Sequence, residues 1–329
     1  MLKTITIVSA LVSVALAQNS TASASSSASS AASTVNPLIP SGISPTCLSF
    51  LQSLNSDSSL TSCLTSLSSA TSAFAPGSST TPSSAAVTAA LGNLCTDSVT
   101  SACSESLIRS KITSFYTACT DELTTKRVDD AVKIYDVLYT ILPLRTSVCS
   151  KDDTGSWCVM ADTTTTREVS DEASGDSSTL SLAKLMALLY TKNSALQRRA
   201  TVSAIVPNIT TYHDTNLPFI FFKPSLDATR LCTTCSRNVL TAYINFESNV
   251  PYAPGLTASL LLSTQSDLYT AIQQKCPANF LSGAVQAAGG LSSGSGIFSS
   301  GAVSTVSSEY SSILAIAMGV ATLGFTVAF

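Results

Sequence analysis

The chain of 329 residues carries a formal net charge of −3, and only 11% of its residues are charged. This weakly acidic balance, without any basic run, lacks the electrostatic footprint of a nucleic-acid-binding protein, so we expect no nucleic-acid partner. Serine and threonine supply most of the polarity, which is typical of O-glycosylated extracellular proteins.

The first residues, 1–17, have the three parts of a secretory signal peptide. Lys3 provides a positive charge, Ile5–Leu16 an apolar core, and Ala15–Leu16–Ala17 a small-residue cleavage motif. Most of residues 18–44 are Ser, Ala or Thr. Such a segment cannot bury enough apolar surface to offset the entropy lost on ordering, so we expect it to be disordered.

Between residues 45 and 280, apolar residues recur at spacings of three and four, the pattern of amphipathic helices. The clearest helix is predicted over about Arg127–Leu142. Its two adjacent apolar rows indicate a place at the centre of the core, and Pro143 is expected to end it. Shorter apolar stripes predict further helices around Cys47–Leu54, Leu60–Leu67, Val87–Cys95 and Ile108–Cys119.

The second half of this region has a mixed pattern. Residues 161–178, acidic and rich in Thr and Ser, predict a mobile loop, and Leu180–Tyr190 predicts a helix. Residues 200–223 lack a helical period, so we expect an extended, irregular segment with one short strand. Helices are predicted again over Cys232–Phe246 and from about Leu256 to Cys276, just before Pro277.

The last part of the chain has the pattern of a GPI-attachment signal. Gly- and Ser-rich residues 281–300 predict a flexible stalk, and small residues near Ser300 precede a polar spacer and the apolar run Ile313–Phe329. The run falls short of the about 20 apolar residues of a membrane-spanning helix, and no Lys or Arg follows it. We therefore expect residues 301–329 to be removed and a glycolipid to be attached at Ser300, with Ser299, Gly301 and Ser304 as alternatives.

All 10 cysteines lie in the predicted mature chain, and an even number in a secreted protein indicates a disulfide framework. They fall on the apolar stripes of the predicted helices. The predicted fold class is therefore mainly α, a disulfide-stapled helical bundle with one extended segment at about 200–223 and disordered termini. The cysteines are Cys47, Cys63, Cys95, Cys103, Cys119, Cys149, Cys158, Cys232, Cys235 and Cys276.

Two predictions concern how these cysteines pair. The polar turn between Cys149 and Cys158 predicts a bond between the two. Seven cysteines precede the cysteine-free stretch in the middle of the chain and three follow it, so at least one disulfide must join the two sides if all are paired. Cys232 and Cys235 share a helix face and are expected to reach across, toward the helix of Cys119. We therefore expect a single domain over 45–280.

Ordered cysteines alternate with helix patterns in Leu94–Cys95, Phe115, Cys119, Ile134–Tyr139, Pro143–Arg145, Cys149, Trp157–Cys158, Leu231–Cys235 and Ala242–Tyr243. This arrangement resembles a family of fungal secreted proteins, which are GPI-anchored, cysteine-rich surface proteins that carry a domain of unknown function. The resemblance covers roughly Cys47–Cys276. It implies a fungal origin and brings no catalytic residues with it.

No pattern in the sequence indicates a catalytic, cofactor or metal site. Cys232–Thr233–Thr234–Cys235 would need a βαβ setting for redox chemistry or two more ligands for zinc, so structural disulfides are preferred. His213, the single histidine, is expected in a polar surface loop and is not accompanied by a nucleophile-elbow motif. The carboxylate pairs that could hydrolyse glycosides each fit a helix start, a turn or an acidic loop; they are Asp129/Asp130, Asp152/Asp153 and Asp171/Glu172.

These patterns predict a non-enzymatic, GPI-anchored protein of the plasma membrane's outer face or the cell wall, with a role in wall structure, adhesion or ligand binding. Its expected partners are the membrane, through the glycolipid, and a wall polysaccharide or another surface protein; no cofactor is expected. The alternative is a surface-anchored hydrolase of wall polysaccharide. Asn19 and Asn208 begin N-glycosylation sequons, and Arg198–Arg199 is an open candidate for proteolytic processing.

Overall fold

The computed structural model describes residues 39–74, 83–161, 190–192 and 205–281. Within these ranges the chain is mainly helical and all of its cysteines are paired, which confirms the predicted fold class. None of the described helices is both long enough and apolar enough to cross a membrane. The predicted signal peptide, the loop at 161–178, the stalk and the anchor signal lie outside the described residues, apart from Ala161 at the loop's start and the short overlap at Leu281.

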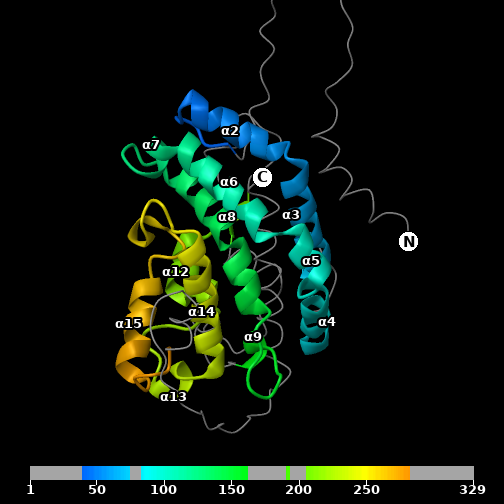
Figure 1. The fold of residues 1–329 in the computed structure, drawn as a ribbon, viewed down its shortest axis with the longest axis vertical. Helices are drawn as coiled ribbons and strands as arrows, with labels where there is room; N and C mark the ends of the chain where they lie inside the picture. The colour runs from blue at the N-terminus through cyan, green and yellow to red at the C-terminus, as the bar shows by residue number, and fades with distance from the viewer. Residues whose placement is uncertain (1–38, 75–82, 162–189, 193–204, 282–329) are drawn as a thin grey trace, which may run out of the picture. The chain divides into compact units, whose positions relative to one another are not determined.

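Helix α8 (Asp129–Val148) lies at the centre of the fold, as predicted. Its buried residues extend all the way around the helix, which is expected where neighbours cover every side. Figure 1 shows α8 between the N-terminal helices and the C-terminal ones, and its most extensive contacts are with α14 (Thr234–Asn249) and α6 (Glu105–Ala118).

The prediction that Pro143 ends this helix is wrong. Pro143 lies inside α8, which continues to Val148. An internal proline costs a helix about 3 kcal/mol. Beyond it, however, Leu144, Ser147 and Val148 are buried, and this tertiary packing outweighs the local preference. Sequence alone shows the proline but not the neighbours that cover the following turn.

The N-terminal helices each begin at a side-chain cap. They are α2 (Pro45–Asn55), α3 (Ser58–Ala70), α4 (Ser84–Leu94), α5 (Asp97–Ala102) and α6, capped in turn by Ser44, Asp57, Ser83, Thr96 and Ser104. Each cap oxygen accepts a backbone N–H that the helix leaves unbonded. A 3₁₀ turn, η1 (Ser72–Phe74), follows α3, and the short α7 (Thr120–Leu123) leads into α8. The α3, α4 and α5 helices pack together, and α2 packs on α6.

The C-terminal part differs from the sequence-based predictions in three places. Tyr190, the end of a predicted helix, belongs to β1 (Tyr190–Lys192), which pairs antiparallel with β2 (Ile205–Pro207); the rest of that predicted helix lies outside the described residues. In the segment at 200–223, β2 is the expected short strand, but α12 (Ile209–Thr215) and η2 (Leu217–Phe219) follow it. The last helix, α15 (Gln265–Lys275), begins later than predicted; η3 (Leu256–Ala258) and a turn come first.

The two remaining short helices of the described residues, α9 (Cys158–Ala161) and α13 (Ala228–Leu231), each begin or end next to a cysteine. The α9 helix follows the turn after α8, and α13 directly precedes Cys232. Both are only four residues long. Their positions are therefore set by the disulfides and by packing, since isolated helices of this length are unstable in water.

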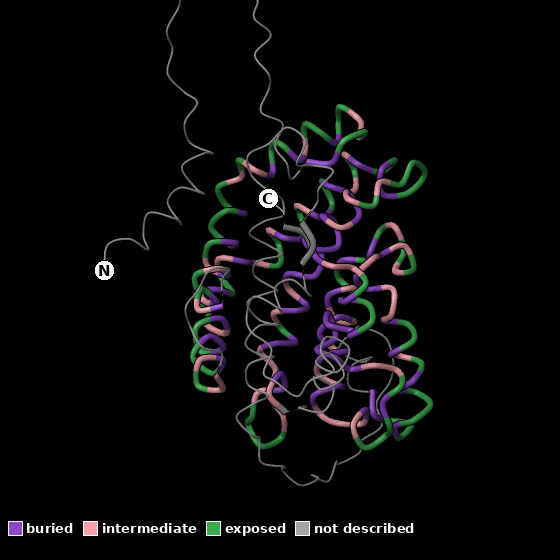
Figure 2. Tube along the Cα trace, turned by 180° about the vertical axis from the view of Figure 1, so that it is seen from behind, coloured by how far each residue is buried: buried purple, intermediate pink, exposed green. Residues whose placement is uncertain are grey.

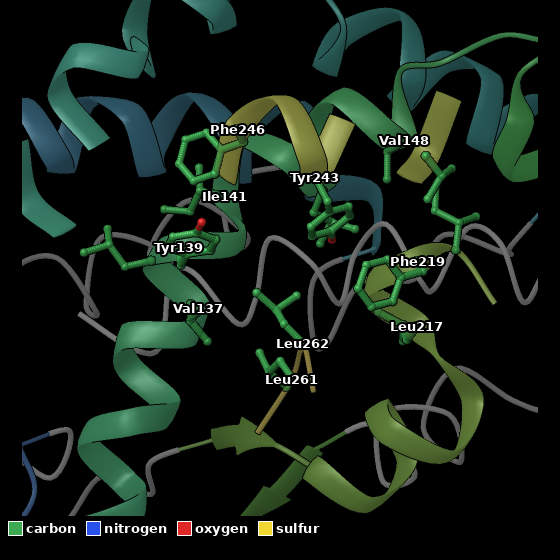
Figure 3. Close-up of a cluster of buried hydrophobic side chains, with 14 of the residues drawn as sticks. Val137, Tyr139, Ile141, Val148, Leu217, Phe219, Tyr243, Phe246, Leu261 and Leu262 are labelled. Carbon is green, nitrogen blue, oxygen red and sulfur yellow. The ribbon is translucent and has the colours of Figure 1, made fainter. Parts of the chain in front are cut away.

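Aromatic side chains from several elements meet in the core. Tyr139 of α8 packs edge-on against Phe246 of α14, with ring centroids 5.0 Å apart, and Phe219 of η2 packs against Tyr243 of α14 at 4.6 Å. Figure 3 shows these rings together with Leu261 and Leu262 from the chain before α15. In Figure 2 the buried residues follow the inner sides of the helices. Among the large hydrophobic side chains of the described residues, only Leu48 is exposed, at 36%.

Candidate functional site

The most deeply buried carboxyl group among the described residues is that of Asp136, in the middle of α8. Its side chain is fully buried. It accepts hydrogen bonds from the hydroxyls of Tyr252 (2.5 Å) and Ser259 (2.8 Å). It also accepts bonds from the backbone N–H groups of Leu260 (2.7 Å) and Leu261 (3.1 Å). All four donors come from one segment, 250–264, which connects α14 to α15.

Two opposing effects act on this carboxyl. Burial raises the pKa of Asp136 to about 6, although the bonds from Tyr252, Ser259 and the two backbone amides act to lower it. Burial also raises the pKa of Tyr252, and the adjacent Asp136 carboxylate raises it further. Both groups therefore have pKa values above those of exposed side chains, and the raised pKa of Asp136 lies in the weakly acidic range.

The same segment is held at two further points. The hydroxyl of Tyr139 donates to the backbone carbonyl of Val250 at 2.5 Å. At the other end, the Gln265 side-chain amide donates to the carboxylate of Glu247 on α14 at 2.9 Å, and burial raises the pKa of Glu247. We call residues 250–264 the clamped segment, because α8 and α14 fix it through side chains rather than through a regular backbone ladder.

This arrangement is suited to holding structure rather than to converting a substrate. The donors around Asp136 are the protein's own, two of them backbone groups that cannot turn away. A buried carboxylate that is fully bonded in this way stabilises the segment that supplies the donors. We therefore treat the Asp136 cluster as a structural site that fixes the C-terminal elements on α8.

A second buried carboxylate, Glu122, lies near the N-terminal end of the described chain. Its Oε1 accepts the backbone N–H of Ser44 at 2.6 Å, just before α2. Burial acts to raise the pKa of Glu122, but the bonds from Ser44 and from its own amide outweigh burial, and the pKa is lowered. Potential ligand atoms of Glu122, Cys47 and Cys119 lie within 4.8 Å of one another, but the two sulfurs are joined in a disulfide and are not available as thiolates.

The structure forms five disulfides from the ten cysteines, with none free. The predicted bond between Cys149 and Cys158 is wrong. The pairs are Cys47–Cys119, Cys63–Cys103, Cys95–Cys149, Cys158–Cys235 and Cys232–Cys276. One bond, Cys158–Cys235, joins the two sides of the chain as the odd counts required, but neither Cys232 nor Cys235 reaches Cys119.

The reason lies in the register of the turn between the two cysteines. Lys151 pairs with Trp157 in an antiparallel bridge, and the N–H of Cys158 donates to the carbonyl of Ser150 at 3.0 Å. Cys158 is thus opposite Ser150. Cys149 instead lies at the end of α8 and is bonded to Cys95, while Cys158 begins α9 and is bonded to Cys235. The ribbon also carries Lys151 over the Trp157 ring, 4.3 Å from its centroid.

The other candidates from the sequence do not come together in one place. His213 lies in α12, not in a loop; its side chain is exposed, and Nδ1 is 3.2 Å from Asp214 Oδ1. Asp129 and Asp130 are in the first turn of α8, and each forms a salt bridge with a nearby base. Asp152 and Asp153 lie in the turn before α9, where Asp152 accepts bonds from the turn itself and Asp153 from Thr234.

The modification sites are only partly described. Asn208 directly precedes α12 and is half-buried. Asn19, Ser300, Arg198–Arg199 and the pair Asp171/Glu172 lie outside the described residues. These sites remain predictions from the sequence.

Sequence reasoning missed Asp136, Tyr252 and Ser259. The available signal was an aspartate within the continuous apolar run of the central helix, where an ionisable residue is rarely buried without a partner. The partners could not be identified, because they lie more than a hundred residues away along the chain.

Comparisons with protein-family models, with curated protein sequences and with solved structures found no match to this chain.

Proposed function

We propose that this protein is a non-enzymatic, GPI-anchored protein of the cell surface or cell wall, whose disulfide-cross-linked helical ectodomain serves in wall structure, adhesion or ligand binding. The observation that carries the proposal is the pairing of all ten cysteines within the chain. Structural disulfides persist in oxidising, extracellular compartments and are rare in the cytosol. The signal-peptide pattern at residues 1–17 and the pattern around Ser300 agree with that compartment.

The proposal of a non-enzymatic role is supported by how the buried carboxylates are used. Asp136 binds the clamped segment and Glu122 binds the amide that begins α2. The alternative, a hydrolase of wall polysaccharide, would use a pair of carboxylates about 5–10 Å apart across an open cleft. Asp129 and Asp130 instead bond to basic side chains at their own helix start, Asp152 bonds to its own turn, and Asp153 accepts from Thr234 of α14.

The anchor is tested by expressing the full chain in a eukaryotic secretory host. Phosphatidylinositol-specific phospholipase C should release the protein from the membrane fraction, and deletion of residues 313–329 should direct it to the medium instead. As a control, replacing Ile313–Phe329 by a longer apolar helix followed by Lys and Arg should keep the protein membrane-bound and resistant to the phospholipase. Detection of the intact Ile313–Phe329 peptide in the mature membrane protein would contradict the anchor.

The non-enzymatic role is tested separately with the secreted form. It should release no reducing sugar from isolated cell-wall polysaccharides, while retention on the same polysaccharides in a pull-down would identify a binding role. Hydrolysis that is lost when Asp152 and Asp153 are both changed to Asn, but kept in the variant with Asp129→Asn and Asp130→Asn, would establish the alternative.

A further inference from the structure

Two disulfides meet at the turn Cys232–Thr233–Thr234–Cys235. Cys232 is bonded to Cys276, and Cys235 is bonded to Cys158. The two bonds are therefore separated by only two residues, although they lead to distant parts of the chain. Cys158 belongs to the N-terminal part of the chain, while Cys276 follows α15.

The local backbone holds the two cysteines of this turn close together. Cys232 ends α13 and Thr233 caps α14, where its hydroxyl accepts the N–H of Ser236 at 3.3 Å. The hydroxyl of Ser236 donates to the carbonyl of Leu231, so the residues on either side of the motif are in contact. The motif is thus a closed turn at the start of a helix, which keeps the two cysteines near each other.

The two existing bonds differ in access to solvent. Cys232 is half-buried and its partner Cys276 is 8% exposed, whereas Cys158 is 2% exposed and Cys235 is 4% exposed. An external thiol therefore reaches the Cys232–Cys276 bond more readily than the Cys158–Cys235 bond. Cys232 also directly precedes the N-terminus of α14, where the helix dipole favours a thiolate.

We propose that this turn is a disulfide-exchange switch, in which reduction of Cys232–Cys276 leads to a Cys232–Cys235 bond and releases Cys158. In the first step, a reduced dithiol attacks Cys232–Cys276 and becomes a disulfide, leaving Cys232 and Cys276 as thiols. In the second step, the Cys232 thiolate attacks Cys235, forming Cys232–Cys235 and expelling the Cys158 thiolate, which takes up a proton. The net change consumes two electrons from the dithiol and leaves Cys158 and Cys276 as thiols.

The exchange is favoured by proximity. A bond between Cys232 and Cys235 closes a loop of a few residues, whereas Cys158–Cys235 closes a loop with a sequence separation of 77. Because only two residues of the closed turn separate Cys232 from Cys235, a free Cys232 thiolate stays near the Cys158–Cys235 bond in the folded protein. Cys158–Cys235, which joins the two sides of the chain, would thus break when the neighbouring Cys232–Cys276 bond is reduced.

Two variants of the full chain test the exchange and serve as matched controls, because each removes the same Cys232–Cys276 bond. In Cys276→Ser, the remaining Cys232 thiol should move to Cys235 without added reductant. Alkylation after acid quenching, followed by peptide mapping, should then find the label on Cys158 and a Cys232–Cys235 linkage. In Cys232→Ser, the free thiol is Cys276, so the label should stay on Cys276, and Cys158–Cys235 should remain intact.

The wild-type protein provides an independent measurement should either variant fail to fold. Graded treatment with a dithiol should label Cys158 and Cys276 in equal amounts, while Cys232 stays unlabelled. Label on Cys232 in the Cys276→Ser variant with Cys158–Cys235 intact, or label on Cys232 and Cys276 as a pair in the wild type, would overturn the proposal.

Discussion

The raised pKa of Asp136 predicts that the contribution of this residue to the stability of the fold falls as the pH rises from about 4 to about 7. Burial raises its pKa from 3.8 to about 6, so the folded state binds a proton more tightly than the unfolded state does. The contribution to stability is complete below the unfolded pKa and is lost as the pH passes through the folded one. A shift of about two units, at about 1.36 kcal/mol each, corresponds to about 3 kcal/mol.

The variant Asp136→Asn isolates this effect from the other titrating groups. Its amide keeps one oxygen acceptor but turns an NH₂ group toward the N–H groups of Leu260 and Leu261, so it should be less stable than the wild type. Because Asn does not titrate, the stability difference between wild type and variant should be largest near pH 4. It should shrink by about 2.4 kcal/mol by pH 7, because pH 4 already lies slightly above the unfolded pKa.

The assay is chemical denaturation of the oxidised protein between pH 4 and pH 7, followed by the fluorescence of the single tryptophan, Trp157. Glu105→Gln, which removes an exposed carboxylate from the first turn of α6, controls for the loss of one negative charge. A stability difference that stays constant, or that grows with pH, would refute the reasoning. It would mean that the four hydrogen bonds offset the effect of burial, so that the pKa of Asp136 is not raised in the folded protein.

Two further outcomes are expected. Cleavage of the chain anywhere between Cys158 and Cys235 should give fragments that migrate together on a gel without reductant and separate with it, and separation without reductant would contradict the Cys158–Cys235 bond. Arg145→Ala should lower the free energy of unfolding by about 1.5–3 kcal/mol, because the guanidinium donates to the carbonyls at the end of α4, including Leu94 at 3.1 Å. Arg109→Ala, on the exposed side of α6, should change the free energy of unfolding by less than about 0.5 kcal/mol. Thermal unfolding of both variants measures the two effects, and equal effects would argue against a role of Arg145 in capping α4.

The helices of this fold could be predicted from the sequence because their signal is local. Spacings of three and four located α14 and the first part of α8, and the same apolar rows identified α8 as central. The errors arose where tertiary contacts override local preference. The buried turn after Pro143 continues a helix that a proline would end in isolation, and α12 forms in a segment without a helical period.

The cysteine pairing and the Asp136 cluster could not be predicted, for a different reason. Parity required that a bond join the two sides, and Cys158–Cys235 does so, but parity does not say which cysteines pair. The bonds to Asp136 join residues that are 116 and 123 positions apart, so no local pattern reports them. An aspartate in an apolar helix indicates a buried partner without identifying it.

The disulfide pattern also determines how the protein would respond to a pull on its two ends. The shortest covalent path from Cys47 to Cys276 crosses four disulfides. It follows the backbone only between Cys119 and Cys95, between Cys149 and Cys158, and between Cys235 and Cys232. That is roughly 36 residues, or about 130 Å when fully extended, against about 800 Å for the same stretch without disulfides.

A protein with this disulfide pattern would act as a short tether. Its maximum extension is limited by the disulfides rather than by the stability of its core. Exchange at the turn before α14 would change that extension. With Cys232 bonded to Cys235, the path from Cys158 must follow the backbone to the turn and on to Cys276, and the tether could lengthen to about 520 Å. The same chain would then extend further under tension in a reducing environment, and it would stay short in an oxidising one.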